Sequence, residues 1–260
     1  METSRGFVSE KPPYMETKVL VAFSLAIAFT IWNVPEDMNM MEVGELILPI
    51  FICCLGMLVF DKLVGSRTLA PWKMLHAVVN IFVALFSFPD ILILAEDPIM
   101  SCHGQGSLIP NALIAALHIY HLIGFRVTSA DWFHHILFVG TLCPIAMFRE
   151  VGPVKNLVAF FVCGLPGGLD YILLVLVKHD MIHRLTEKKW NARINVWMRS
   201  PGCFACVAVM YMIMRYDTGS ICEEHMYEGI IIMLLVLFNG QYYMQVVVGN
   251  TFRKDQRYSS

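Results

Sequence analysis

Residues 71–98 read PWKMLHAVVNIFVALFSFPDILILAEDP, and this stretch decides the fold class of the chain. Its middle part, residues 74–94, carries only His76 and Asp90 as ionisable side chains. A run of about 20 apolar residues is long enough to cross a bilayer as a helix. The whole chain has the same character, because 57% of its 260 residues are hydrophobic and 15% are charged; a soluble domain has about 25% charged residues. The sequence therefore predicts an all-α polytopic membrane protein without a separate soluble catalytic domain.

Seven other apolar runs accompany this stretch. They cover residues 19–34, 46–60, 108–124, 133–148, 156–177, 202–214 and 229–248. We therefore expect about eight transmembrane helices. Two of them, 133–148 and 202–214, are short and need neighbouring helices to complete a span. The polar segment 1–17 lacks a signal-peptide cleavage pattern, so the first run is expected to be a signal anchor.

The basic residues predict the orientation of the bundle. Suppose that the N-terminus is cytosolic and that all eight apolar runs cross the membrane. Of the 19 Lys and Arg residues, only Arg149, Lys155 and Arg215 then lie on the far, non-cytosolic side. The far-side loops are acidic instead, for example in residues 36–45. Because cytosolic loops of membrane proteins carry an excess of Lys and Arg, both termini are expected in the cytosol.

The loops hold two further features. The basic loop at about 178–201, interleaved with Trp190 and Trp197, suits either an amphipathic helix on an anionic leaflet or a solvated loop that only sets topology. Cys102 and Cys222 both fall in far-side loops, and they are a candidate disulfide if that side is the lumen of the secretory pathway. No metal site is predicted.

Ionisable side chains inside the spans are candidates for function, because charge is rare within a bilayer. Under the eight-span topology, four spans place His or Asp in the cytosolic half of the membrane. We predict a shared polar pocket there, in which the catalytic residues are His134, His135 and Asp170 and the lipid- or substrate-binding residues are His76, Asn80, His118 and His121.

Adjacent histidines point in directions about 100° apart on a helix. One of His134 and His135 can therefore face the pocket as a general base while the other packs or orients it. Three interpretations of Asp170 stay open: it holds an imidazole in one tautomer, it accepts a proton, or it makes a hydrogen bond between helices.

Three segments resemble the TLC family, named after the TRAM, LAG and CLN homology domain. The first is residues 71–98, with a Trp, a His shortly after it, a long apolar run and an acidic-Pro end. The second, residues 116–140, reads ALHIYHLIGFRVTSADWFHHILFVG and resembles the family's short span, cytosolic loop and double histidine. The third, residues 237–254, reads LFNGQYYMQVVVGNTFRK and resembles its last helix.

The resemblance implies four parts along the chain. These are a cytosolic N-terminal segment (1–17), two additional transmembrane helices (18–70), a TLC-like membrane domain whose six helices form a barrel (71–250) and a cytosolic tail (251–260). It also implies residence in the endoplasmic reticulum or a connected membrane.

In the family's ceramide synthases, acyl-CoA donates an acyl chain to a sphingoid amine, and the double histidine is catalytic. The resemblance carries that role onto His134 and His135 only. The chain departs from the ceramide synthase pattern, because no aspartate pair follows the double histidine and His121 stands where many members have Asp. Asp170 is also the only acid in GLPGGLDY, residues 164–171.

We therefore expect a protein of lipid metabolism or membrane lipid homeostasis that binds a lipid or acyl chain in its barrel. The alternative is a ceramide synthase-like lipid N-acyltransferase, with His134 or His135 as general base and acyl-CoA as co-substrate. Neither needs another cofactor. The expected partners are membrane lipids, with a homodimer left open and no nucleic acid. A di-iron histidine-box enzyme and a proton-coupled transporter are disfavoured, because clustered ligand boxes and an inverted repeat are not evident.

Overall fold

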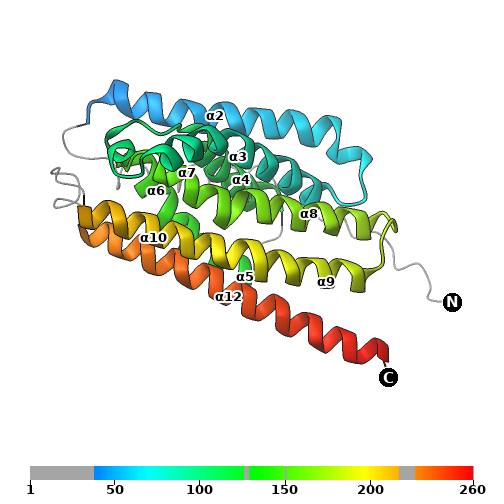
Figure 1. Cartoon of the computed structure of the whole chain (residues 1–260). Coiled ribbons are helices and arrows are strands. Elements are labelled where there is room, and N and C mark those ends of the chain that lie inside the picture. The colour runs from blue at the N-terminus through cyan, green and yellow to red at the C-terminus, as the bar shows by residue number, and fades with distance from the viewer. Residues whose placement is uncertain (1–37, 126–128, 150, 217–225, 260) are drawn as a thin grey trace.

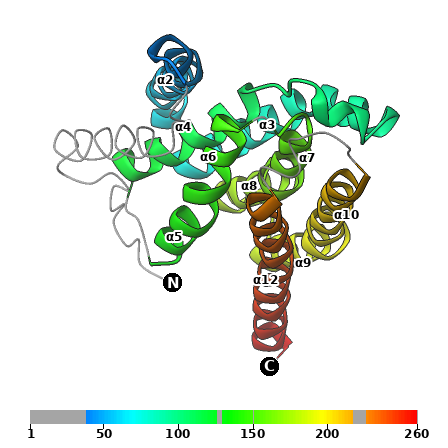
Figure 2. The ribbon, with the colours of Figure 1, turned by 90° about the vertical axis from the view of Figure 1, so that its left-hand side faces the viewer.

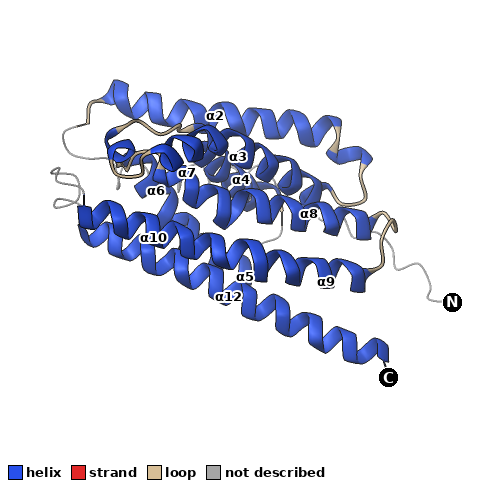
Figure 3. Ribbon diagram, viewed as in Figure 1, coloured by secondary structure: helices blue, strands red, loops and turns tan. Residues whose placement is uncertain are grey.

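The computed structural model describes residues 38–125, 129–149, 151–216 and 226–259. These residues are helical apart from short connections, and no strand occurs among them (Figure 3). The long helices lie side by side in one bundle (Figure 1). The prediction of an all-α chain is thus confirmed for the described residues.

The helices follow one another with short connections. In chain order they are α2 (Met40–Leu63), η1 (Gly65–Arg67), α3 (Pro71–Glu96), η2 (Met100–His103), α4 (Ile109–Gly124), α5 (Ser129–His134), η3 (His135–Val139), α6 (Gly140–Phe148), α7 (Val154–Ala159), η4 (Phe160–Gly164), α8 (Leu165–Lys178), α9 (Arg184–Ile194), η5 (Asn195–Arg199), α10 (Ser200–Tyr216) and α12 (Met226–Ser259). Here η1 and η2 are 3-10 turns, whereas η3, η4 and η5 are π-helical turns that join the helices on either side of them.

Five of the resulting helices are long and apolar enough to cross a membrane. They cover Met41–Arg67, Pro71–Glu96, Val154–Lys178, Arg184–Tyr216 and Met226–Gln256. Ile109–Leu122 and His135–Phe148 form two shorter apolar helices. This set is compatible with a multi-pass membrane protein. The predicted first span, 19–34, lies outside the described residues, so a total of eight spans stays a prediction.

Of the two interpretations of residues 178–201, the solvated loop does not fit the structure, because helix begins again at Arg184 and continues unbroken to Tyr216. The reason lies in the four-residue spacing of Glu187, Asn191 and Asn195, which puts these side chains on one face of the helix. All three are buried, at 1%, 4% and 1% exposure, and α9 packs on α8 and α12. The basic segment is therefore a packed extension of the span that follows it, and the short run 202–214 belongs to a 33-residue helix.

Small residues allow the closest helix pairs to form. On α8 and the turn before it, a Cβ added to Gly168 would lie 2.8 Å from Ile81 Cδ1, and one added to Gly164 would lie 3.2 Å from the Ala84 nitrogen. Between α10 and α12, a Cβ on Gly240 would lie 2.9 Å from Cys203 Cβ. Because hydrocarbon offers no hydrophobic drive for helix association, membrane helices rely on such close packing.

A buried polar network ties α3, α4 and α7 together. The Asn156 side chain, fully buried, donates to the Asp90 carboxylate and to the Ser107 carbonyl oxygen, the latter over 2.8 Å. Its own oxygen accepts from Asn111 Nδ2 over 2.9 Å, and Asp90 also accepts from the Ser107 amide over 2.9 Å. Buried polar groups of this kind need partners, and here three helices supply them to one another.

Helix α2 lies at the edge of the bundle (Figure 2). It packs mainly on α4, and the Tyr120 hydroxyl donates to the buried Asp61 carboxylate over 2.9 Å. Nine α2 side chains are both exposed and apolar, among them Phe51, Leu55 and Leu58. Such a surface is suited to contact with lipid.

Candidate functional site

Five histidines from four helical segments meet inside the bundle. They are His76 of α3, His118 and His121 of α4, His134 of α5 and His135 of η3. The ring centroids of His118 and His134 lie 5.2 Å apart, and those of His121 and His135 lie 5.0 Å apart. Four of the five are buried, and His134 is partly buried. The structure therefore brings together all five histidines that the sequence placed in one pocket.

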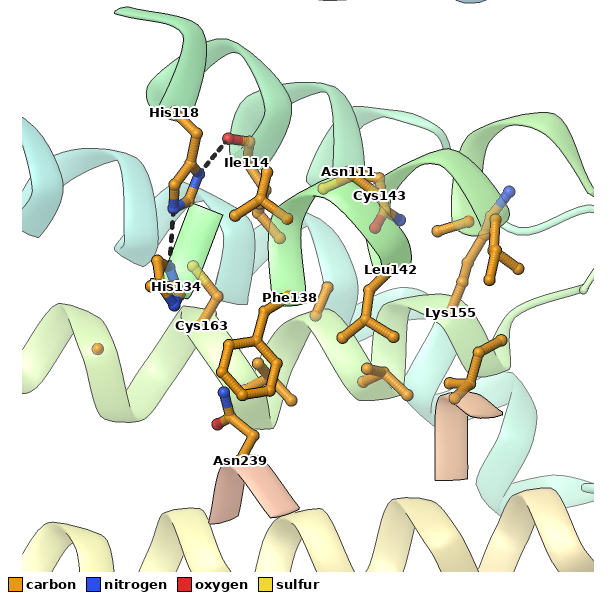
Figure 4. A pocket seen from close by; sticks show the side chains of 18 of the residues that line it. Asn111, Ile114, His118, His134, Phe138, Leu142, Cys143, Lys155, Cys163 and Asn239 are labelled. Carbon is orange, nitrogen blue, oxygen red and sulfur yellow. Dashed lines mark hydrogen bonds between the residues drawn. The ribbon is translucent and has the colours of Figure 1, made fainter. Parts of the chain in front are cut away.

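A chain of hydrogen bonds runs through His118 and His134 (Figure 4). His118 Nδ1 lies 2.7 Å from the Ile114 carbonyl oxygen, which can only accept, so this nitrogen carries the proton. His118 Nε2 then accepts from His134 Nε2 over 3.1 Å, when both rings are neutral. This leaves His134 Nδ1 as the acceptor for the Tyr243 hydroxyl at 3.3 Å. The fold thus selects the tautomer of both rings.

The second pair, His121 and His135, lies behind the first. His121 Nδ1 and His135 Nε2 are 3.1 Å apart, and neither residue lines the cavity described below. Trp72 packs against this pair from α3, with its ring centroid 4.0 Å from that of His121. Of the double histidine, His134 is therefore the ring at the cavity and His135 is the one that packs behind it.

A cavity of about 420 Å³ opens in front of His118 and His134. Its wall changes character along its length. Near the histidines it is polar, with His76, Asp170, Tyr171, Arg199 and Tyr243 in the wall.

Figure 4 shows Phe138 and Leu142 next along the cavity and Lys155 at the end away from the histidines. Much of the remaining wall is aliphatic, built for example by Val158, Val162 and Ile232, with polar side chains such as Asn111 and Asn239 among them. The cavity can therefore hold a molecule with one polar end and one long apolar part.

Three π-helical turns contribute to this wall. Phe138 belongs to η3, Cys163 to η4 and Arg199 to η5, and all three side chains line the cavity. A π-turn inserts one residue into a helix and redirects the side chains around it, and such turns are frequent at functional sites. Their meeting at one cavity marks this region as the candidate site.

Asp170 and Asn80, both predicted for the site, also line the cavity. Asn80 Oδ1 accepts from Cys163 Sγ over 3.1 Å. Within the described residues no hydrogen bond joins Asp170 to a histidine, and Asp170 Oδ1 is buried without a partner. Asp170 therefore does not hold an imidazole in this structure.

Eight polar residues of the wall were not predicted for the site from the sequence: Asn111, Asp131, Lys155, Tyr171, Arg199, Glu228, Asn239 and Tyr243. Two signals could have found three of them. Asn239 and Tyr243 lie four residues apart in the last apolar run, so they share one face of that helix. Arg199 continues the four-residue spacing of the buried face of α9, but the predicted loop concealed that pattern.

One other prediction, the candidate disulfide, stays untested. The candidate disulfide lies outside the described residues, because Cys222 and the Cys102 side chain are not among them. Among the described residues, no group of three or more His, Cys, Asp or Glu side chains is arranged to hold a metal ion.

The comparisons with known proteins find no relative: no protein-family model, no curated protein and no solved structure matches this chain.

Proposed function

We propose that the chain is a membrane protein of lipid homeostasis that binds one lipid, with an acyl chain in the aliphatic part of the cavity and the polar group beside His118 and His134. The observation that carries this proposal is one cavity that joins the cluster of polar side chains at the histidines to a largely apolar wall. Its volume of about 420 Å³ is in the range of small-molecule sites, about 300–1,000 Å³. Each methylene that leaves water contributes about 0.8 kcal/mol, so the aliphatic wall favours long chains.

The proposal includes membership of the TLC family and a location in the endoplasmic reticulum or a connected membrane, with both termini in the cytosol. The three resembling segments and the distribution of Lys and Arg support it. The site would then lie toward the cytosolic side, where the double histidine begins its span.

Blocking the cavity tests the binding function. In Val158→Trp an indole replaces a small side chain of the cavity wall, whereas Val59→Trp places the same side chain on the exposed face of α2. The full chain is purified in mild detergent, and the lipids that remain bound are measured by mass spectrometry. We expect Val158→Trp to lose at least nine-tenths of the bound lipid and Val59→Trp to keep it. Equal lipid content in two monodisperse variants would refute the proposal.

A second function is favoured by the hydrogen-bonded chain from Tyr243 to His118. In an acyl-CoA-dependent N-acyltransferase, an amine nitrogen attacks the thioester carbonyl, the C–N bond forms, and the C–S bond breaks to release the CoA thiol. The amine proton passes to the Tyr243 oxygen as the Tyr243 proton moves to His134 Nδ1. The resulting imidazolium then protonates the leaving thiolate through the same hydroxyl.

The test is acyl transfer from a long-chain acyl-CoA to a long-chain amine by the purified chain. His134→Ala should abolish turnover. His183→Asn changes a histidine that caps α9 outside the cavity and keeps a capping acceptor, so it should leave the rate unchanged. Turnover that survives in His134→Ala would exclude this mechanism, and no turnover in the unmodified chain would leave lipid binding as the function.

A further inference from the structure

Buried polar atoms without a hydrogen-bond partner among the described residues lie in the cavity wall. Four of them are His76 Nε2, Asp170 Oδ1, Arg199 Nε and Asn239 Oδ1. The four side chains come from four helical segments, α3, α8, η5 and α12. Since nearly all buried polar atoms in proteins are hydrogen-bonded, four unpartnered atoms around one cavity indicate the polar groups of its ligand.

Arg199 requires an acceptor with negative charge. Its guanidinium is a cation, and its Nη1 donates to the neutral Asn195 side chain over 3.3 Å. Its central carbon lies 5.7 Å from the centroid of the Tyr243 ring. No carboxylate of the described residues lies within 4.0 Å of its nitrogens. A phosphate matches the fork of N–H groups that a guanidinium presents.

Asp170 and Asn239 require donors. Both unpartnered atoms are side-chain oxygens that accept hydrogen bonds. A fatty acid carboxylate or a phosphate monoanion offers these two oxygens few or no hydrogen-bond donors, and a quaternary ammonium carries no N–H at all. A primary ammonium carries three N–H donors, as in lysine, so it offers enough for both acceptors. Asp170 also supplies the matching negative charge.

We propose that the polar end of the cavity holds a phosphoethanolamine-type headgroup, with its phosphate at Arg199 and its primary ammonium at Asp170. This inference rests on the proposed binding of a lipid in the cavity and names the headgroup class. Asp170 and Arg199 line one cavity without pairing with each other. A zwitterionic headgroup carries a positive and a negative charge at separate positions, so it can pair with both. His118 and His134 then face the ester region of the lipid.

The test uses the unmodified full chain, purified in detergent and stripped of lipid. Binding of dioleoyl-phosphatidylethanolamine is compared with that of its N-monomethyl, N,N-dimethyl and trimethyl (phosphatidylcholine) derivatives, and with that of oleic acid. Each methyl group removes one N–H while the phosphate, the charge and the chains stay the same. We expect affinity to fall along this series, with phosphatidylcholine and oleic acid bound about tenfold more weakly, which corresponds to about 1.4 kcal/mol.

Two variants assign the charges to their residues. Asp170→Asn should reduce the preference for ethanolamine over choline to about twofold or less, and Arg199→Gln should weaken both phospholipids by about tenfold. Asp180→Asn is the matched control, because Asp180 is exposed, lies outside the cavity and has a positive φ of 56° that Asn also adopts.

The outcomes separate this inference from the proposed function. Equal affinity along the methylation series, or tighter binding of oleic acid than of phosphatidylethanolamine, overturns the headgroup and leaves lipid binding intact. Absence of any bound lipid, together with no effect of Val158→Trp, overturns the proposed function itself. If Asp170→Asn does not fold, the methylation series on the unmodified chain still decides.

Discussion

Replacing Asn156 by Leu tests whether the buried polar network holds α3, α4 and α7 together. The Asn156 side chain is completely buried and makes three hydrogen bonds, to Asp90, Ser107 and Asn111. Leu has a similar size but no polar atom, so the variant leaves no large cavity. It removes one donor from the Asp90 carboxylate, the donor to the Ser107 carbonyl oxygen and the acceptor of Asn111 Nδ2.

The magnitude follows from the two kinds of bond that are lost. A hydrogen bond between neutral groups in a membrane bundle contributes about 0.6 kcal/mol on average, because the unfolded chain also finds partners. A hydrogen bond to a charged group contributes about 1.5–3 kcal/mol. The bond to Asp90 and the two neutral bonds, to Asn111 and Ser107, together give an expected loss of about 3–4 kcal/mol. With about 2–4 °C per kcal/mol for a chain of this length, Tm should fall by roughly 6–16 °C.

The assay is thermal unfolding in mild detergent, followed by size-exclusion chromatography of the soluble fraction. Asn250→Leu is the matched control, since Asn250 is exposed on α12 and its change should stay within about 0.5 kcal/mol. In the Asn156→Leu background, Asp90→Asn should recover part of the loss because it removes the charge that has lost a donor. An Asn156→Leu variant as stable as Asn250→Leu would show that the network does not stabilise the bundle.

Three further predictions follow from the packing, the site and the topology. Gly240→Leu should destabilise the α10–α12 pair by about 1–3 kcal/mol in the same assay, because even a Cβ at position 240 would lie 2.9 Å from the Cys203 Cβ. Gly56→Leu is the control and should leave stability unchanged, because a Cβ at position 56 would have no atom within 4 Å. Tyr243→Phe removes the hydroxyl at the double histidine, so any acyl transfer should fall at least tenfold while bound lipid stays constant; an unchanged rate would exclude the hydroxyl from proton transfer. In sealed microsomes an impermeant maleimide should label Arg253→Cys directly and Met100→Cys only after permeabilisation, and labelling of both from one side would contradict the predicted topology.

The sequence by itself determined that the chain is a bundle of apolar helices. The predicted runs 74–94 and 156–177 correspond to Pro71–Glu96 and Val154–Lys178 in the structure. Hydropathy predicts these helices because insertion into a bilayer depends on the summed hydrophobicity of one segment. That sum can be taken without knowing which helices pack beside it. The same reasoning brought His76, His118 and His134 to one depth, since depth along a helix follows directly from position in the run.

Only the tertiary structure decided which side chains face the cavity. That His134 lines it while His135 packs behind depends on the rotation of one helix against its neighbours, and a π-turn that begins at His135 changes this rotation. Arg199 enters the wall because distant helices bury the face of α9 that carries it, although its segment alone reads as a polar loop. Rotation and burial are set by contacts between segments far apart in the sequence, whereas hydropathy is a property of one segment. For this reason the side chains that face the cavity could be identified only in the folded chain.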